Sequence, residues 1–225
     1  MHHIKNWAVP TELSLPNAKQ LHLWRIDLDE TDDEMEAVLS EDEQARAKRF
    51  HQEQDRTRFI KARGAMRLLL GCYLATPPEE LVFVYGPQGK PFIASPASVL
   101  TFNISHTGNL ALLGVSREAA IGIDLECVRE KPNLRAIARR VFGTTIQQEL
   151  SQLEGAALAE AFFRHWTAYE ARMKAIGNGI FSDHNPTRDA ELQATHFVPE
   201  EGYMAAVVLE GEPPPFEEWQ IHLFE

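Results

Sequence analysis

The chain has 225 residues, of which 44% are hydrophobic and 24% are charged, and its formal net charge is −11. This acidic balance argues against nucleic acid or an anionic membrane as a general partner, and no apolar run approaches the ~20 residues of a membrane-spanning helix. The N-terminus lacks the apolar core of a signal peptide, so we expect a cytoplasmic protein. Cys72 and Cys127 both lie in apolar stretches, which predicts two buried thiols rather than a disulfide or a metal site.

The first half of the chain changes from strand-like to helical patterns and back. Apolar and polar side chains alternate over 20–29, which predicts a strand. Ser40 followed by Glu43 is a capping-box signature and predicts a helix that continues to residue 50. Apolar side chains at helical spacing predict a longer helix over 55–74. Short strands are then expected at 81–85, 92–93, 99–108 and 110–115, with a Gly- and Pro-rich turn at 86–91.

The second half repeats this order of elements. The expected elements are a strand at 119–128, a short basic helix at 133–141, a helix capped by Thr144 or Thr145, a long helix at 156–176 ended by Gly177 and Gly179, one or two strands at 192–209 and a last strand at 219–224. The two halves predict an α+β fold of two similar lobes, residues 1–116 and 117–225. Because the second lobe is already present in the chain, we expect a monomer.

Two carboxylates lie on one face of the strand at 119–128. Asp124 and Glu126 are two residues apart and point the same way, while the apolar residues that alternate with them point into a core. Gly122 would leave the carboxylate face open. Adjacent carboxylates are tolerated where water screens them or where a cation lies between them, and Mg²⁺ prefers such oxygen ligands. The pair therefore indicates either a solvent-facing strand or a hard-cation site.

Glu170 and Lys174 lie one turn apart, beside the apolar stripe of the long helix. A surface ion pair worth about 0.3–0.5 kcal/mol is the simpler interpretation. A carboxylate in an otherwise apolar helix can instead complete a metal site or accept a proton, and the lysine can neutralise a phosphate.

Groups that suit phosphate gather in the first half. Asn103, Ser105 and His106 end a strand, where a plain polar turn is the alternative. Phosphate binding is favoured over a catalytic Ser-His pair, because neighbouring side chains on a strand diverge. Gly89 and Lys90 can present backbone N–H groups and an ammonium group to an anion, although the spacing is not that of a P-loop. The basic stretch 44–67 indicates either a solvated helix face or a phosphate site.

In their order and spacing, these motifs resemble the 4′-phosphopantetheinyl transferase superfamily, and in particular its two-lobed, surfactin-synthetase-activating branch. The matching stretches are 46–50, 62–64, Gly89–Pro91, Phe102–Gly108, Ile121–Glu126 and Trp166–Gly177. The resemblance covers roughly residues 40–209.

The resemblance implies an enzyme that transfers the phosphopantetheine arm of coenzyme A to a serine of an apo acyl, peptidyl or aryl carrier protein. The other product would be adenosine 3′,5′-bisphosphate, and coenzyme A would lie in the cleft between the lobes. The implied Mg²⁺ ligands are Asp124, Glu126 and Glu170, and the implied catalytic residues are Asp124, Glu170 and Lys174, with Glu170 accepting the proton of the carrier serine. The implied coenzyme A-binding residues are Arg46, Gly89, Lys90, Asn103, Ser105, His106 and Lys174.

One position departs from the family pattern, because Tyr169 stands where the helix motif usually has a lysine. The missing charge leaves open a non-catalytic homologue that binds coenzyme A or carriers. The carboxylates alone would also suit a Mg²⁺-dependent phosphate-ester hydrolase. Since carrier proteins are acidic, the resemblance implies a local docking patch, for which the candidates are Arg135, Arg139 and Arg140.

Overall fold

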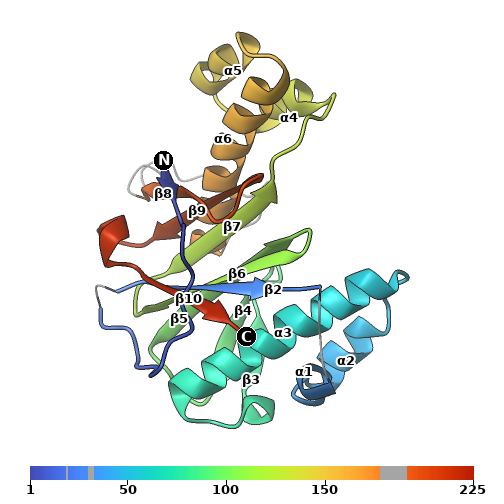
Figure 1. The fold of residues 1–225 in the computed structure, drawn as a ribbon, viewed down its shortest axis with the longest axis vertical. Coiled ribbons are helices and arrows are strands. Elements are labelled where there is room, and N and C mark those ends of the chain that lie inside the picture. The colour runs from blue at the N-terminus through green and yellow to red at the C-terminus, as the bar shows by residue number, and fades with distance from the viewer. Residues whose placement is uncertain (19, 30–32, 178–191) are drawn as a thin grey trace.

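A computed structural model describes residues 1–18, 20–29, 33–177 and 192–225, which form strands and helices in the mixture that the sequence predicts (Figure 1). The helices are α1 (Asp33–Ala37), α2 (Glu41–Ala47), α3 (Glu53–Leu74), α4 (Leu134–Val141), α5 (Thr144–Ser151) and α6 (Gly155–Ile176). The strands are β1 (His2–His3), β2 (His22–Asp27), β3 (Val82–Tyr85), β4 (Pro91–Ser95), β5 (Leu100–Thr107), β6 (Leu110–Arg117), β7 (Ile121–Cys127), β8 (Ala194–Val198), β9 (Tyr203–Leu209) and β10 (Gln220–Phe224). The predicted α+β class is confirmed.

Two four-stranded sheets organise the fold, one from each half of the chain. The first has the strand order β10-β2-β6-β5, the second has the order β1-β8-β9-β7, and β3 and β4 form a separate hairpin. Each sheet also takes a strand from the opposite end of the chain, since β1 pairs in parallel with β8 and β10 pairs in parallel with β2. The division of the chain at residue 116 stays a prediction, and the terminal strands cross it.

The alternation of side chains along the strands builds a layered core. In β2, Trp24 and Ile26 pack with α3, whereas Leu23 points to the other side and packs with apolar residues of β7 and β9. On the far side of the second sheet, Ala171 of α6 packs against Val208 of β9. The layers therefore run α3, first sheet, second sheet, α6, and the two sheets share one core.

Most predicted element boundaries agree with the structure to within a few residues. Gly177 ends α6 with a left-handed backbone (φ 77°), as expected, whereas Gly179 lies outside the described residues. The prediction of two buried thiols is wrong. Cys72 is exposed because it lies on the side of α3 opposite its buried face, and Cys127 is half-buried because β7 leaves the core there. In the described part of the chain, no helix is long and apolar enough to cross a membrane.

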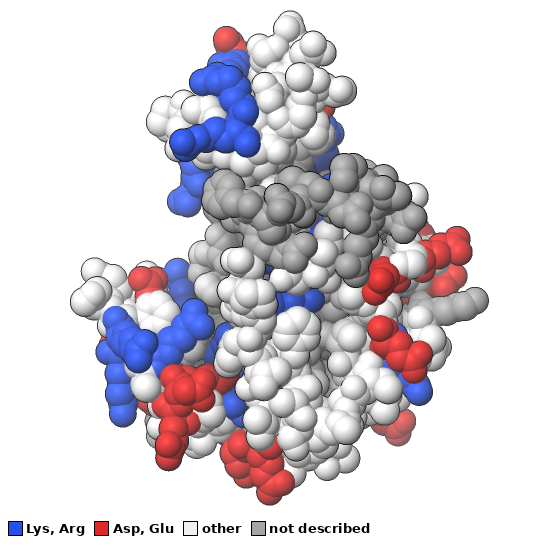
Figure 2. Space-filling view, turned by 180° about the vertical axis from the view of Figure 1, so that it is seen from behind, with Lys and Arg blue, Asp and Glu red and all other residues white. Residues whose placement is uncertain are grey.

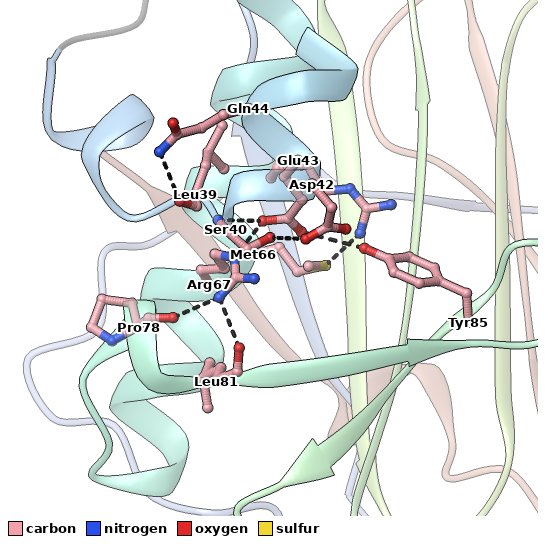
Figure 3. A network of polar contacts seen from close by, with 11 residues as sticks. Leu39, Ser40, Asp42, Glu43, Gln44, Met66, Arg67, Pro78, Leu81 and Tyr85 are labelled. Atoms are coloured by element: carbon pink, nitrogen blue, oxygen red, sulfur yellow. Dashed lines mark hydrogen bonds and ion pairs between the residues drawn. The ribbon is translucent and has the colours of Figure 1, made fainter.

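A buried ion pair fixes α2 to α3. Glu43 and Arg67 are both 2% exposed, and Arg67 Nε donates to Glu43 Oε2 over 2.6 Å. Arg67 Nη1 also donates to the carbonyl oxygens of Pro78 and Leu81, at 2.9 and 3.0 Å, while Glu43 Oε2 accepts from the backbone N–H of Ser40 at 3.2 Å (Figure 3). The Nε and Nη1 atoms of Arg67 are thus both bonded inside the first lobe.

Replacing Glu43 should therefore destabilise the protein. We expect Glu43→Ala to lower the free energy of unfolding by about 3–5 kcal/mol, because it leaves the Arg67 charge buried without its counter-ion. Urea unfolding followed by circular dichroism measures the loss. Asp42→Ala is the matched control, since Asp42 is exposed and should contribute about 1 kcal/mol or less. Equal losses in the two variants would contradict a buried pair.

Candidate active site

The carboxylate face of β7 is closed by α6. Asp124 is only 5% exposed, so it does not lie on a wet strand face. The expectation that Gly122 leaves this face open is wrong, because a Cβ atom at Gly122 would lie 1.9 Å from the carbonyl oxygen of Ala171. Gly122 instead lets the α6 backbone lie directly against β7. This close approach brings residues 170 and 174 of α6 to the carboxylates of β7.

One oxygen of Asp124 is bound and the other is left without a partner. Lys174 Nζ lies 2.7 Å from Asp124 Oδ1, and Ser105 Oγ donates to the same oxygen over 3.1 Å. Lys174 Nζ also donates to Ser105 Oγ at 3.0 Å. Asp124 Oδ2 is buried and has no hydrogen-bond partner among the described residues. A buried carboxylate oxygen without a donor is costly, so it marks a position that suits a cation.

The other two carboxylates have raised pKa values. Burial, and then the charge of Asp124, raises the pKa of Glu170 to about 7, although Lys174 opposes the shift. Burial and Asp124 also raise the pKa of Glu126, which has a hydrogen bond to the Trp166 side chain. Within the described residues, no three His, Cys, Asp or Glu side chains are arranged so that they could already hold a metal ion. The three carboxylates therefore influence one another electrostatically without forming a preformed metal cage.

A pocket of about 220 Å³ adjoins these carboxylates and is lined by both halves of the chain. Lys174 belongs to both features, because it lines the pocket and pairs with Asp124. The sequence-predicted residues that line the pocket are Arg46, Gly89, Lys90, Asn103, His106 and Lys174. Ser105 points away from it, toward Asp124, which agrees with the expected divergence of Ser105 and His106.

The pocket is cationic in an acidic protein. His106, which is exposed at its wall, has a lowered pKa because the surrounding protein displaces water and because Lys174, Arg63 and Arg46 place positive charge nearby. Arg46 also lies over the ring of Phe59, 5.2 Å from its centroid. Positive charge converging on one pocket favours a phosphate-bearing ligand.

Arg63 is a pocket residue that the sequence reasoning did not select. It is 9% exposed, and the ion pairs formed among the described residues do not include it. Its guanidinium group lies between the rings of Phe59 and Tyr85, 5.9 and 5.7 Å from their centroids, and burial lowers its pKa. A buried cation that faces a pocket without a paired carboxylate suits an anionic ligand. The sequence feature that could have identified Arg63 is its position in the stretch 62–64, which resembles the family pattern.

The basic stretch 44–67 divides between two roles. Arg46 and Arg63 line the pocket. In contrast, Arg56 pairs with Glu36 and Glu53, Arg58 pairs with Asp29, and Arg67 pairs with Glu43. Some members of this stretch are therefore ion-paired within the protein, and for the two that line the pocket the phosphate site stays a prediction.

Tyr169 has a packing role at the position of the departure from the family motif. Its ring meets that of Phe142 edge-on at 6.3 Å and lies 6.3 Å from the ring of Trp166. These contacts belong to the apolar cluster that joins α4 and α5 to α6. Tyr169 thus stabilises the helical end of the second lobe.

Comparison with known proteins assigns both halves of the chain to one family. Residues 120–217 match the model of the 4′-phosphopantetheinyl transferase superfamily, and residues 23–118 match that of the 4′-phosphopantetheinyl transferase N-terminal domain. The chain is 38% identical over 209 residues to the 4′-phosphopantetheinyl transferase HetI of Nostoc, covering 85% of this chain and 88% of that relative. It is 39% identical over 169 residues to a putative 4′-phosphopantetheinyl transferase of Synechocystis, covering 74% of this chain and 69% of the relative.

A shorter similarity extends to enterobacteria, where the transferase AcpT of Salmonella typhimurium is 38% identical over 117 residues, or 52% of this chain and 59% of the relative. The chain belongs to the 4′-phosphopantetheinyl transferase superfamily. The prediction of family and enzyme class is thereby confirmed.

Proposed function

We propose that the protein transfers the 4′-phosphopantetheine arm of coenzyme A to a serine of an apo acyl or peptidyl carrier protein, in a Mg²⁺-dependent reaction that releases adenosine 3′,5′-bisphosphate. The observation that carries this proposal is the double position of Lys174. Its ammonium group pairs with the carboxylate of Asp124 and also lines the cationic pocket. Coenzyme A carries a 3′-phosphate and a 5′-pyrophosphate on one ribose. Its 3′-phosphate would fill the pocket while its pyrophosphate reaches the carboxylates.

The donor set fits Mg²⁺, which takes oxygen ligands from one or two carboxylates together with phosphates and water. Asp124 Oδ2 is buried and free to accept a cation, and Glu126 and Glu170 are close enough to Asp124 for its charge to raise their pKa values. We assign these three residues as the ligands. The bound ion would stabilise the negative charge of the departing bisphosphate.

The remaining roles, phosphate binding and proton transfer, are assigned to side chains of the protein. Arg46, Arg63 and His106 would hold the 3′-phosphate end in the pocket, and Lys174 would neutralise the pyrophosphate. Glu170, whose pKa is raised to about 7, is suited to accept the proton of the carrier serine near neutral pH. The nucleophile belongs to the partner, which agrees with the absence of a catalytic Ser-His pair at residues 105 and 106.

The direct test mixes the protein with coenzyme A, Mg²⁺ and several apo carrier proteins and weighs each carrier by mass spectrometry. We expect a gain of one phosphopantetheine arm and no gain when EDTA replaces Mg²⁺. Binding of coenzyme A with no gain on any carrier would favour a non-catalytic homologue. Release of the bisphosphate without a carrier would favour the hydrolase.

Carrier docking is proposed at the basic surface of α4. Arg139 and Arg140 are exposed, whereas Arg135 is half-buried and donates to the carbonyl oxygen of Leu153, so it is less available. Figure 2 shows basic side chains gathered at the end of the molecule that α4 and α5 form. We expect Arg139→Glu/Arg140→Glu to raise KM for the carrier about tenfold with little change in kcat, because complementary charge mainly assists association.

Steady-state kinetics with varied carrier concentration measures this effect. The matched control is Arg117→Glu, which reverses an exposed charge on β6. An unchanged KM in the α4 double variant would place docking elsewhere. We also propose that the protein belongs to the surfactin-synthetase-activating branch and acts as a monomer, because one chain matches both the N-terminal and the superfamily models. The cytoplasmic location stays a prediction.

A further inference from the structure

Three side chains of β5 are bonded to the backbone of the segment that contains β7. Thr101 donates to the carbonyl oxygen of Ala119. Asn103 Oδ1 accepts from the N–H of Ile123 at 2.8 Å, and Ser105 Oγ accepts from the N–H of Leu125 at 3.3 Å. The three bonds use every second residue of β5 and come from one of its faces, so this face of β5 lies along one edge of β7.

Lys90 fills the remaining position of this series. Its Nζ atom donates to the carbonyl oxygen of Ile121 at 2.8 Å and to the carbonyl oxygen of Lys174 at 2.7 Å. The alternate residues 119, 121, 123 and 125 are therefore each bound by a side chain of the first half of the chain. The same ammonium group also binds the end of α6.

These bonds pair backbone groups at an edge of β7 that the sheet topology leaves without a partner strand. β5 and β7 are the terminal strands of two different sheets. In an antiparallel strand, alternate residues direct N–H and C=O groups to the edge away from the partner strand, where burial without a partner is costly. The side chains of Lys90, Asn103 and Ser105 supply partners for that edge of β7.

The hydrogen-bonding capacity of Ser105 is fully used by the protein. Its single O–H group donates to Asp124, and its oxygen accepts from Leu125 N–H and Lys174 Nζ. The side chain is 7% exposed. It has no donor left for a phosphate, although the family resemblance implies coenzyme A binding at this residue. Lys90 similarly uses two of its three donors on carbonyl groups.

We propose that Lys90, Asn103 and Ser105 are positioning residues that clamp the edge of β7 to the first lobe and so hold Asp124 and Lys174 in place, and that Ser105 is not a ligand of the phosphates of coenzyme A. This inference rests on the proposed function for its link to transfer. The clamp itself is independent of that function. Its members act at β7 and at the end of α6, which are the two elements that carry the carboxylates and Lys174.

The test uses Ser105→Ala and Asn103→Leu with adenosine 3′,5′-bisphosphate as the probe of the phosphate pocket. We expect calorimetry to show a bisphosphate Kd within about threefold of the wild type. Mn²⁺ affinity, measured by electron paramagnetic resonance, and kcat should fall by about 10- to 100-fold, as for the loss of a group that orients metal ligands. KM for coenzyme A should change little. Ser105→Thr keeps the hydroxyl group and should restore the Mn²⁺ affinity.

Hydrogen exchange and a control variant make the result decisive. Exchange of the amides of Ile123 and Leu125 should quicken by about tenfold or more in Asn103→Leu and Ser105→Ala respectively, since each loses its acceptor. Arg63→Met, the control, should weaken bisphosphate binding by about tenfold or more and leave that exchange unchanged. A Ser105→Ala variant that behaves like Arg63→Met would overturn the proposal. Failure of the wild type to bind the bisphosphate would instead count against the proposed function, with the exchange result still testing the clamp.

Discussion

Asp124→Asn should lower the rate of transfer by about 10³-fold or more while the protein stays folded. The change keeps the shape of the side chain but removes the charge that would hold Mg²⁺, and metal charge stabilisation contributes several kcal/mol at about tenfold per 1.4 kcal/mol. The expected site of the loss is Oδ2, the buried oxygen without a partner. Initial rates of holo-carrier formation, measured by mass spectrometry at saturating coenzyme A, give the effect.

The stability of Asp124 variants separates the roles of its two oxygens. Considered as one of two repelling carboxylates, Asp124 could be replaced by alanine with little loss of stability. The structure changes that expectation, because Lys174 and Ser105 both use Oδ1. We expect Asp124→Ala to lose about 2 kcal/mol, since it leaves those donors unpaired, and Asp124→Asn to lose less.

Asp55→Asn, a change at an exposed aspartate of α3, is the control for both measurements and should affect neither. An Asp124→Asn protein with wild-type transfer would show that the residue is structural. Retention of the full rate after Asp124→Ala would exclude Asp124 from the metal site altogether.

The sequence predicts the elements of this fold well because their signals are local. Helical periodicity marks α3 and α6, and the alternation around Asp124 places Ile123 and Leu125 in the core, where they are 0% and 2% exposed. The exchange of terminal strands could not be predicted, because β1 has only two residues and pairs with a segment almost two hundred positions away. Such a pairing is long-range, and its two short partners carry no periodic pattern.

The sequence predicts which residues lie together at the candidate site, but it does not predict what each of them contacts. The family motifs select side chains such as Lys90 and Ser105, yet a motif does not say whether a polar group faces a ligand or a neighbouring strand. That depends on which edge of β7 meets β5, which only the packing of the two sheets decides. Arg63 was overlooked for the converse reason, since a buried arginine in a basic stretch resembles its ion-paired neighbours until their partners are known.

Gly122→Ala should damage both stability and transfer, although it adds a single methyl group. An added Cβ atom would lie 1.9 Å from the oxygen of Ala171 and 2.4 Å from the nitrogen of Ala175, and both atoms belong to the backbone of α6. Backbone atoms of a helix cannot relieve the clash by a change of rotamer, as the end of a flexible side chain can. The helix must move away from β7, and we expect a cost at or above the upper end of the ~1–3 kcal/mol of overpacking.

The same displacement should reduce transfer by about 10²-fold, because Glu170 and Lys174 move with α6 and a shift of about 1 Å suffices for such a loss. Urea unfolding and holo-carrier formation measure the two effects, and the fall in rate should persist at temperatures where the variant is fully folded. Gly143→Ala is the matched control, since nothing lies within 4 Å of its added Cβ and its backbone is extended, with φ −68° and ψ 167°. That control should cost about 1 kcal/mol or less as a helix-cap change. If Gly122→Ala lost no more stability and rate than Gly143→Ala, α6 would not lie against β7 as closely as the structure places it. The contact that brings Glu170 and Lys174 to Asp124 would then be wrong.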